Sequence, residues 1–373
     1  MLSILILAGA MMCGCGSGGG SGSGTTTPPP TTTPTAAATP TITTTAAMNG
    51  AVVMSIADTT AGATIYYTLD GSAPSTGSQV YQAPVLLGSK ITVNAIAVAS
   101  GFSNSGVANQ VVGTDVAANT LIWSDEFNGG PQSQPDPNTW TYDTGNNGFG
   151  NNELENYCAW GSTTSPCDTA KPNAYVGSDG NLHIVAQRPS AGVYTSARMK
   201  TQGKFSMMYG RIEARMKIPE GQGIWPAFWL LGNNIATINW PACGELDIME
   251  HIDGDNPPAS FGGPPLGYDW VQASVHGTGL NDGKPFHPAG FSAADWHTYG
   301  MIWSKGQIQF YVDDPATPYE TFTSSMPGTW PFDQGPQFVL LNLAVGGNWP
   351  GPPDAKTVFP SEMLVDYVKI YSK

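Results

Sequence analysis

Charged side chains are scarce in this chain of 373 residues: Asp, Glu, Lys and Arg make up 11% of it, less than half the roughly 25% of an ordinary globular protein. Basic residues are the scarcest, with 14 Lys and Arg against 28 Asp and Glu and a net charge of −14. Nucleic acids and anionic lipid surfaces are bound through clusters of Lys and Arg. The composition therefore argues against nucleic acid, anionic lipid or a sulfated ligand as a partner, and suits a neutral one.

Cysteines and helical patterns are also sparse. The five cysteines include no Cys/His set at the spacing of a zinc site, and no convincing long helix appears. Cys158 and Cys167 flank a short polar loop, which leaves two alternatives: a local disulfide in an oxidising compartment, or two unpaired thiols. Glycine (46), proline (31) and aromatic residues are abundant instead. This composition predicts an all-β protein.

The chain begins with a leader, residues 1–15. Its apolar run is too short to span a bilayer as a mature helix and resembles the apolar part of a secretory signal. Cys13 and Cys15 follow, and then a Gly/Ser-rich tether, which is similar to the order in a bacterial lipoprotein signal. We expect a secreted or cell-surface protein on the outer face, lipidated at Cys15, with a plain cleaved signal as the alternative. The lipid anchor would be its only membrane contact.

Composition divides the next part of the chain into a linker and a small β module. Residues 16–46 are Gly/Ser- and then Thr/Pro-rich, and such a segment stays extended and buries nothing. Residues 47–113 contain short alternating segments and resemble the small immunoglobulin-like module found beside secreted glycosidases. We interpret this module as a rigid spacer, or alternatively as a glycan-binding module that uses three tyrosines: Tyr66, Tyr67 and Tyr81.

The large domain, residues 120–373, shows repeated strand patterns separated by Gly, Pro and Asn turns. In residues 211–218, apolar and charged residues alternate, which predicts a strand with one buried and one solvent-facing side. Residues 297–314 predict a hairpin that turns at Lys305-Gly306. A segment of this length and pattern predicts a two-sheet sandwich.

Residues 244–250 (GELDIME) place three acids in a hydrophobic strand. Buried unpaired carboxylates cost several kcal/mol, so such residues are expected to have a use. Alternation puts Glu245 and Asp247 on one face of the strand and the apolar residues between them in the core. A β-bulge at residues 248–249 would return Glu250 to the acidic face.

With the bulge, the carboxyl groups of the two glutamates can lean toward the ~5–5.5 Å separation of retaining glycosidases, rather than the ~6.5–9.5 Å of inverting enzymes. The alternatives are a surface strand with solvated acids or a cation site. The preceding tryptophan-rich segment disfavours both, because Trp225 and Trp229 share one face and aromatic faces stack on sugar rings. Each tryptophan is also compatible with a place in the core.

Several segments together resemble glycoside hydrolase family 16, in its laminarinase-like branch. The resemblance implies a β-jelly-roll with a glycan cleft across its concave sheet. The segments that carry it are residues 123–128, 150–157, 196–232, 240–252, 274–279, 339–351 and 365–371.

The resemblance also implies residue roles. Glu245 would be the nucleophile, Glu250 the general acid/base, and Asp247 a partner that holds Glu245 ready. Some relatives hold a structural Ca²⁺ on the convex side, and the ligands here would be Glu126, the backbone of Gly180, and Asp366. The alternative for these two carboxylates is a surface hydrogen bond or ion pair. The sugar contacts that the family implies are Trp225, Trp229, Asn152, Arg198 and His276.

The implied activity is endo-acting hydrolysis of internal β-1,3 bonds, with mixed β-1,3/1,4 bonds included, in a neutral β-glucan such as laminarin. It needs no redox cofactor or catalytic metal. A transglycosylase and an agarase-type or other β-galactan hydrolase are the alternatives within the family, and two intact glutamates disfavour a non-catalytic glycan-binding protein. We expect a monomer.

Overall fold

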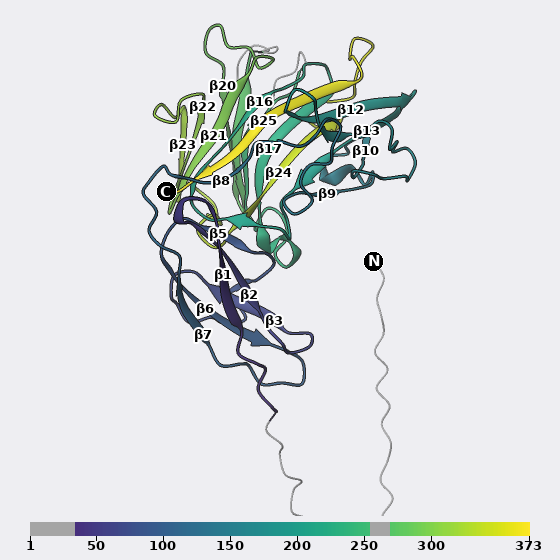
Figure 1. Ribbon diagram of the computed structural model, residues 1–373. Helices are drawn as coiled ribbons and strands as arrows, with labels where there is room; N and C mark the ends of the chain where they lie inside the picture. Colours follow the sequence, from purple (N-terminus) through teal and green to yellow (C-terminus); the bar gives the residue numbers. More distant parts are fainter. Residues whose placement is uncertain (1–33, 254–268) are drawn as a thin grey trace, which may run out of the picture. The chain divides into compact units, whose positions relative to one another are not determined.

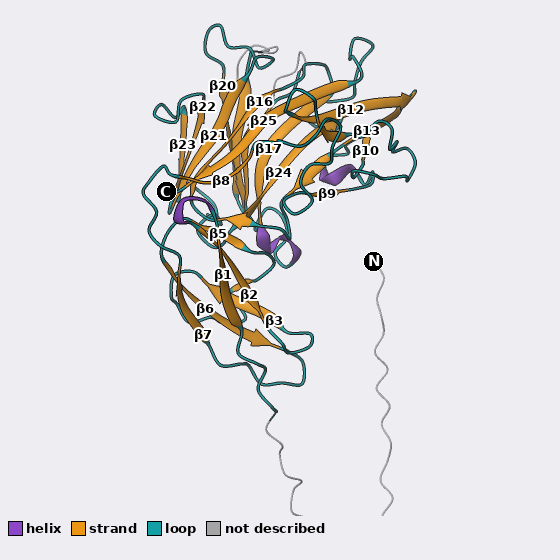
Figure 2. Cartoon of the chain, in the orientation of Figure 1, coloured by secondary structure: helices purple, strands orange, loops and turns teal. Residues whose placement is uncertain are grey.

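The computed structural model describes residues 34–253 and 269–373. Strands dominate these residues, as Figure 2 shows, and the helices among them are short 3-10 turns. The turns are η1 (Met48–Gly50), η2 (Gly148–Gly150) and η3 (Asn233–Ala236). No helix in this described part is long and apolar enough to cross a membrane. The all-β prediction is confirmed, while Cys13, Cys15 and most of the linker lie outside the described residues.

The small module is a sandwich of two groups of strands over a compact apolar core. One group contains β1 (Thr41–Ala46), β2 (Val52–Ala57) and β5 (Val85–Leu87). The other is a four-stranded sheet in the order β4-β3-β6-β7. Its strands are β3 (Thr64–Thr68), β4 (Gln79–Val80), β6 (Ile91–Val98) and β7 (Ala108–Val112).

Two expectations for this part of the chain are wrong. The linker does not extend to residue 46, because the β-branched stretch of β1 pairs antiparallel with β2 and buries Ile42. Tyr67 is not available to a glycan, because it is 2% exposed and packs edge-on against Tyr81, with ring centroids 6.0 Å apart. The three-tyrosine binding surface is therefore excluded.

The large domain packs two sheets face to face, as the sandwich prediction requires (Figure 1). In the first sheet the strands run in the order β15-β24-β17-β18-β19-β20, with β14 also paired to β24 and β9 paired to β14. Strand β5 of the small module continues this sheet by pairing in parallel with β15. The bounds are β9 (Thr141–Asp143), β14 (Arg198–Lys200), β15 (Ser206–Met207), β17 (Ile224–Gly232), β18 (Glu245–Glu250), β19 (Val271–Gly277), β20 (Leu280–Phe286) and β24 (Gln337–Val345).

The second sheet has the order β10-β13-β12-β25-β16-β21-β22-β23, with β11 beside β12 and β8 beside β25. Strands β21 and β22 form the predicted hairpin, with its turn at Lys305 and Gly306. The bounds are β8 (Leu121–Asp125), β10 (Glu155–Tyr157), β11 (Ala174–Val176), β12 (Leu182–Ser190), β13 (Val193–Ser196), β16 (Gly210–Lys217), β21 (His297–Ser304), β22 (Gln307–Val312), β23 (Glu320–Thr323) and β25 (Ser361–Tyr371).

Strand β16 shows how alternation builds the core and where it misleads. Its apolar residues are fully buried between the sheets, as predicted. Glu213, on the face expected to meet solvent, is only 6% exposed. It accepts hydrogen bonds from the hydroxyls of Tyr311 and Tyr371 and from Arg211, whose guanidinium lies over the ring of Tyr371. Aromatic side chains from β22 and β25 cover the outer face of β16, and the sequence of β16 itself does not predict them.

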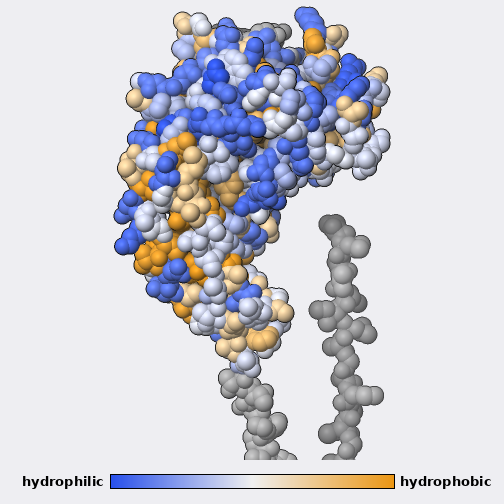
Figure 3. Space-filling view, in the orientation of Figure 1, coloured by the Kyte–Doolittle hydropathy of each residue, from blue (hydrophilic) through white to orange (hydrophobic). Residues whose placement is uncertain are grey.

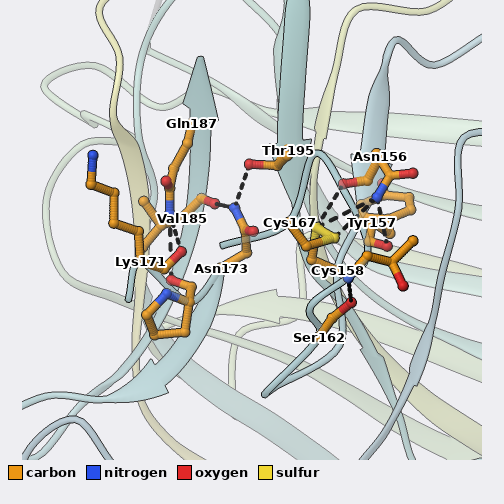
Figure 4. The surroundings of a disulfide bond; sticks show 12 residues. Asn156, Tyr157, Cys158, Ser162, Cys167, Lys171, Asn173, Val185, Gln187 and Thr195 are labelled. Atoms are coloured by element: carbon orange, nitrogen blue, oxygen red, sulfur yellow. Dashed lines mark hydrogen bonds between the residues drawn. A yellow bond between two sulfur atoms is a disulfide. The ribbon is translucent and has the colours of Figure 1, made fainter. Parts of the chain in front are cut away.

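The disulfide alternative for Cys158 and Cys167 is confirmed. Figure 4 shows it beside Asn156 and Tyr157, at the end of β10, and Asn156 donates a hydrogen bond of 3.2 Å from Nδ2 to the sulfur of Cys167. The disulfide fixes the chain where it leaves the sheet after β10. Cys243 is a buried free thiol.

Large apolar side chains remain exposed in both modules. The face in Figure 3 is mostly polar over the large domain, and apolar colouring gathers over the small module. Because several of these side chains belong to loops and turns, they do not disturb the two-sheet core. The exposed set is Met48, Phe102, Val107, Val111, Leu154, Ile238, Trp240 and Val358.

Candidate active site

A cleft of about 670 Å³ crosses the first sheet of the large domain. Its lining residues come from β14, β24, β17, β18, β19 and β20, and from the loops at 149–153, 235–240 and 349. Neighbouring strands lie about 4.8 Å apart, so a cleft that crosses six strands is roughly 24 Å long. It is long enough to hold several sugar residues of one chain.

The predicted β-bulge in β18 is present and turns all three acids toward this cleft. Asp247 and Glu250 of β18 pair with Ser274 and Gln272 of β19, so three residues along one strand oppose two along the other. The register against β17 shifts at the same place. The extra residue returns Glu250 to the face of Asp247, and the side chains of Leu246, Ile248 and Met249 fill the core.

Asp247 lies at the centre of a hydrogen-bond network that reaches both glutamates. It is 3% exposed, and its Oδ2 accepts from Ser274 Oγ at 2.9 Å and lies 3.0 Å from His276 Nε2. Ser274 Oγ is also 3.1 Å from Glu250 Oε2, and His276 Nε2 is 3.8 Å from Glu245 Oε1. The network places one cationic side chain among three carboxyl groups and sets the position of each.

Strand β17 supplies the aromatic wall. Trp225 and Trp229 face the cleft, as predicted, and each is oriented by its indole N–H. Trp225 Nε1 donates to Glu250 Oε1 at 3.1 Å, and Trp229 Nε1 donates to Asn342 Oδ1 at 2.7 Å. Arg198 lies over the Trp229 ring, with its Cζ 4.7 Å from the centroid, and pairs with Asp143 through Nε at 3.0 Å. The tryptophans therefore form fixed apolar platforms with polar groups at their edges.

Burial and mutual repulsion raise the pKa values of both glutamates. For Glu250, burial and then the charge of Asp247 raise the pKa to about 8. For Glu245, the same two causes raise the pKa, and the charges of His276 and Arg198 oppose them. Burial alone would lower the pKa of His276, but the hydrogen bond and charge of Asp247 raise it to about 10. His276 Nε2 lies 3.8 Å from Glu245 Oε1, and the charge of Arg198 also lowers the pKa of Glu245, so we assign the ionised form to Glu245 and the proton to Glu250.

This protonation state predicts the pH dependence of activity. Glu250 can donate a proton only while it is protonated, so kcat/KM should hold through pH 7 and fall as the pH rises through about 8, where the raised pKa of Glu250 lies. An unperturbed glutamate would lose its proton near pH 4.3. The measurement is kcat/KM between pH 4 and 10. An alkaline limb centred below pH 6 would contradict the assigned environment.

Asn152 does not line the cleft, although it was expected to contact sugar. Its φ of +56° turns the chain, its side chain is exposed, and its Nδ2 donates to Asn348 Oδ1 at 2.9 Å. Its neighbours Asn151 and Glu153 line the cleft instead. Further lining residues that sequence reasoning missed come from loops and from strands distant in sequence. They are Phe149, Trp240, Gln272, Asn281, Asn342 and Trp349.

The two carboxylates expected to hold calcium are paired with basic side chains. Glu126 Oε1 is 3.2 Å from Lys369 Nζ, and Asp366 Oδ2 is 2.7 Å from Arg215 Nη1. Ca²⁺ takes six to eight oxygen ligands, and carboxylates that are already paired with cations do not favour it. Gly180 has a φ of +79°, as suits a tight turn. Both carboxylates form ion pairs, as the alternative interpretation expected. The binding of calcium stays a prediction.

Among the described residues, the one group of three closely spaced potential metal ligands is Glu245, Asp247 and His276. This group lies in the cleft, where the hydrogen bond and ion pairs described above already join its members. It is not the site that was expected to hold calcium.

Comparison with known proteins agrees with this geometry. Residues 162–369 match the model of glycosyl hydrolases family 16, and residues 54–112 match the Fn3 associated model. A beta-glucanase of Rhodothermus marinus is 38% identical over an alignment of 270 residues, which covers 67% of this chain and 84% of the relative.

Solved structures give the same result. The laminarinase catalytic domain of Thermotoga maritima is 37% identical, with a TM-score of 0.56, over 68% of this chain and 98% of that domain. The endo-beta-1,3-glucanase of Pyrococcus furiosus is 38% identical, with a TM-score of 0.56, over 68% and 94%. The β-jelly-roll prediction is therefore confirmed. The chain belongs to glycosyl hydrolases family 16 and is a glycoside hydrolase.

Proposed function

We propose that this protein is a secreted, endo-acting β-glucanase that hydrolyses internal β-1,3 bonds of a laminarin-like glucan with retention of configuration. The observation that carries the proposal is the pair Glu245 and Glu250, turned to one face of β18 by the bulge. The length of the cleft supports internal cleavage, because the two acids lie on β18, with strands that line the cleft on both sides. The names of the beta-glucanase and laminarinase relatives support the glucan.

The mechanism follows from the two carboxyl groups. Glu250 gives its proton to the glycosidic oxygen while ionised Glu245 attacks the anomeric carbon, so that the C–O bond to the leaving sugar breaks and a glycosyl-enzyme forms. Glu250 then takes a proton from water, whose oxygen attacks the same carbon and releases Glu245. The cation on His276 stabilises the ionised form of Glu245, and the Trp225 N–H orients Glu250.

A neutral substrate suits the charges of the cleft. The basic side chains among its described lining residues are Arg198 and His276. Arg198 is paired with Asp143 and His276 with Asp247, so an acidic side chain already balances each positive charge. The remaining surface is aromatic, amide or acidic, which binds neutral sugars by stacking and by accepting hydrogen bonds.

A substrate panel tests this proposal. Laminarin, barley β-glucan, agarose, κ-carrageenan and xyloglucan are assayed by release of reducing ends and by oligosaccharide size. We expect laminarin to be cleaved fastest, with barley β-glucan second and early products several sugars long. Faster cleavage of agarose or carrageenan, with laminarin untouched, would overturn the substrate. With a short laminarin oligosaccharide as the substrate, products longer than the starting chain would show transglycosylation, the alternative reaction.

We propose an outer-face lipoprotein as the location, on the order of the apolar run, Cys13, Cys15 and the tether in the leader. The chain should incorporate labelled palmitate in its host, and Cys15→Ala should abolish the label. A label that persists in Cys15→Ala and disappears in Cys13→Ala would move the site. No label at all would contradict the lipid anchor.

A further inference from the structure

A second pair of acids borders the cleft, on the side of the tryptophans away from β18. Glu153 lines the cleft and is 7% exposed, and Glu155, the first residue of β10, is fully buried. Neither belongs to the mechanism above. Two buried carboxyl groups in one place are unfavourable unless their oxygens are satisfied.

The surroundings of this pair favour one proton shared by the two carboxyl groups. Glu155 Oε2 accepts from the backbone N–H of Val345 at 2.7 Å, while its Oε1 meets no donor. Burial and the charge of Glu153 raise the pKa of Glu155 well above its usual value, as does its hydrogen bond to Glu153. Because the N–H of Val345 occupies Oε2, we place the proton of Glu155 on Oε1, and a protonated Glu155 is a neutral donor for Glu153.

Among the described residues, the side-chain donors that contact Glu153 are neutral. Tyr157 donates from its hydroxyl to Glu153 Oε2 at 2.9 Å, and Asn151 Nδ2 lies 3.4 Å from Oε1. Tyr157 is itself fixed, because it is fully buried and precedes the disulfide cysteine Cys158 (Figure 4). Two carboxylate oxygens carry about four acceptor positions, so Glu153 retains capacity for a donor from the cleft.

The position of Glu153 suits a sugar that stacks on the tryptophan wall. A Cβ atom on Gly347 would lie 3.7 Å from Glu153 Cγ and 3.7 Å from Trp225 Cζ3, so Gly347 separates the carboxylate from the indole by a single small residue. Asn342 links the same region to Trp229, because it donates to the Tyr157 hydroxyl and accepts from the indole. An acceptor beside an aromatic face can bind the edge of a stacked sugar.

We propose that Glu153 is a sugar-binding residue whose carboxylate accepts a hydrogen bond from a glucan hydroxyl, and that Glu155 and Tyr157 are positioning residues that hold it. The strand order puts β17 between β24, where Asn342 lies, and β18. Glu153 therefore contacts a sugar away from the bond that is cleaved. The inference rests on the proposed function for the identity of the glycan, and it concerns affinity rather than bond cleavage.

The test measures laminarin binding by titration calorimetry in a Glu245→Gln background, which prevents turnover. Adding Glu153→Gln should weaken binding about 10- to 100-fold, the loss expected for a hydrogen bond to a charged group, with Tm unchanged. Adding Glu155→Gln instead replaces the acid proton with an amide N–H, which can still donate to Glu153. This variant should therefore keep most of the affinity of its Glu245→Gln parent. Glu362→Gln, on β25 of the other sheet, removes a charge elsewhere and serves as the control.

Binding by the Glu153→Gln variant within twofold of its parent would overturn the proposal. An equal loss in Glu362→Gln would overturn it too, because the effect would then be one of net charge. If Glu155→Gln weakens laminarin binding as much as Glu153→Gln does, then a neutral donor at residue 155 does not position Glu153, and that role is overturned. The reducing-end assay of the wild-type protein on laminarin tests the proposed function separately, because it does not depend on these variants. If another glycan is the substrate, the same comparison is made with it.

Discussion

Replacing either glutamate of β18 with glutamine should lower kcat on laminarin by at least about 10³-fold, because one variant lacks the nucleophile and the other the proton donor. Glutamine keeps the size of the side chain, so the strand and its bulge should survive. Azide should restore turnover to a Glu250→Ala variant on a substrate with an activated leaving group, since that substrate needs no acid and azide attacks the glycosyl-enzyme directly.

Thermal unfolding supplies the control for these variants. Burial raises the pKa values of both glutamates in the folded chain, that of Glu250 to about 8. Their contribution to stability is therefore fully present below the unfolded pKa, near 4.3, and is lost as the pH rises through the folded values. At pH 8 the glutamine variants should therefore match or exceed the wild-type Tm. Near-wild-type kcat in either variant would refute the assignment of both roles.

The second large effect is expected from Asp247→Asn, which should lower kcat about 10²- to 10³-fold. Asparagine keeps the shape of the side chain but presents an N–H₂ group to Ser274 or His276, both of which now donate to Asp247. It also removes the charge that raises the pKa values of His276 and Glu250. After burial, the charge of Asp247 is the largest cause of the raised pKa of Glu250, ahead of the opposing charge of His276, so the alkaline limb of the pH profile should move to lower pH.

A matched substitution distinguishes this role from a general loss of charge. Asp179→Asn removes a partly exposed carboxylate that pairs with His183 near the second sheet, and it should leave kcat and the pH profile unchanged. An Asp247→Asn variant with a wild-type alkaline limb would show that Asp247 does not set the protonation of Glu250.

Local alternation was sufficient to predict the acidic strand. An apolar residue on each side of Asp247, and an odd offset between the two glutamates, required a bulge at residues 248–249, and the bulge is there. The same period-two reasoning predicted the buried apolar side of β16 and the faces of Trp225 and Trp229. These features depend only on which side of a pleated strand a residue occupies.

Features that depend on distant partners could not be predicted in this way. Glu213 is buried because aromatic hydroxyls from β22 and β25 cover it. Asn152 turns away from the cleft because its φ is positive, a property of one loop residue that leaves no periodic signal. Trp240 and Trp349 reach the cleft from loops. The Thr-rich segment that was assigned to the linker forms strand β1, because it pairs with β2.

The two-step use of Glu245 and Glu250 fixes the anomer of the first product, and proton NMR of early laminarin hydrolysis tests it. In the first minutes, before mutarotation, the new reducing ends should carry the β-anomeric signal, because two inversions at the same carbon restore the original configuration. The α signal should grow only later. An α signal that appears first would show a single displacement by water and would contradict Glu245 as the nucleophile.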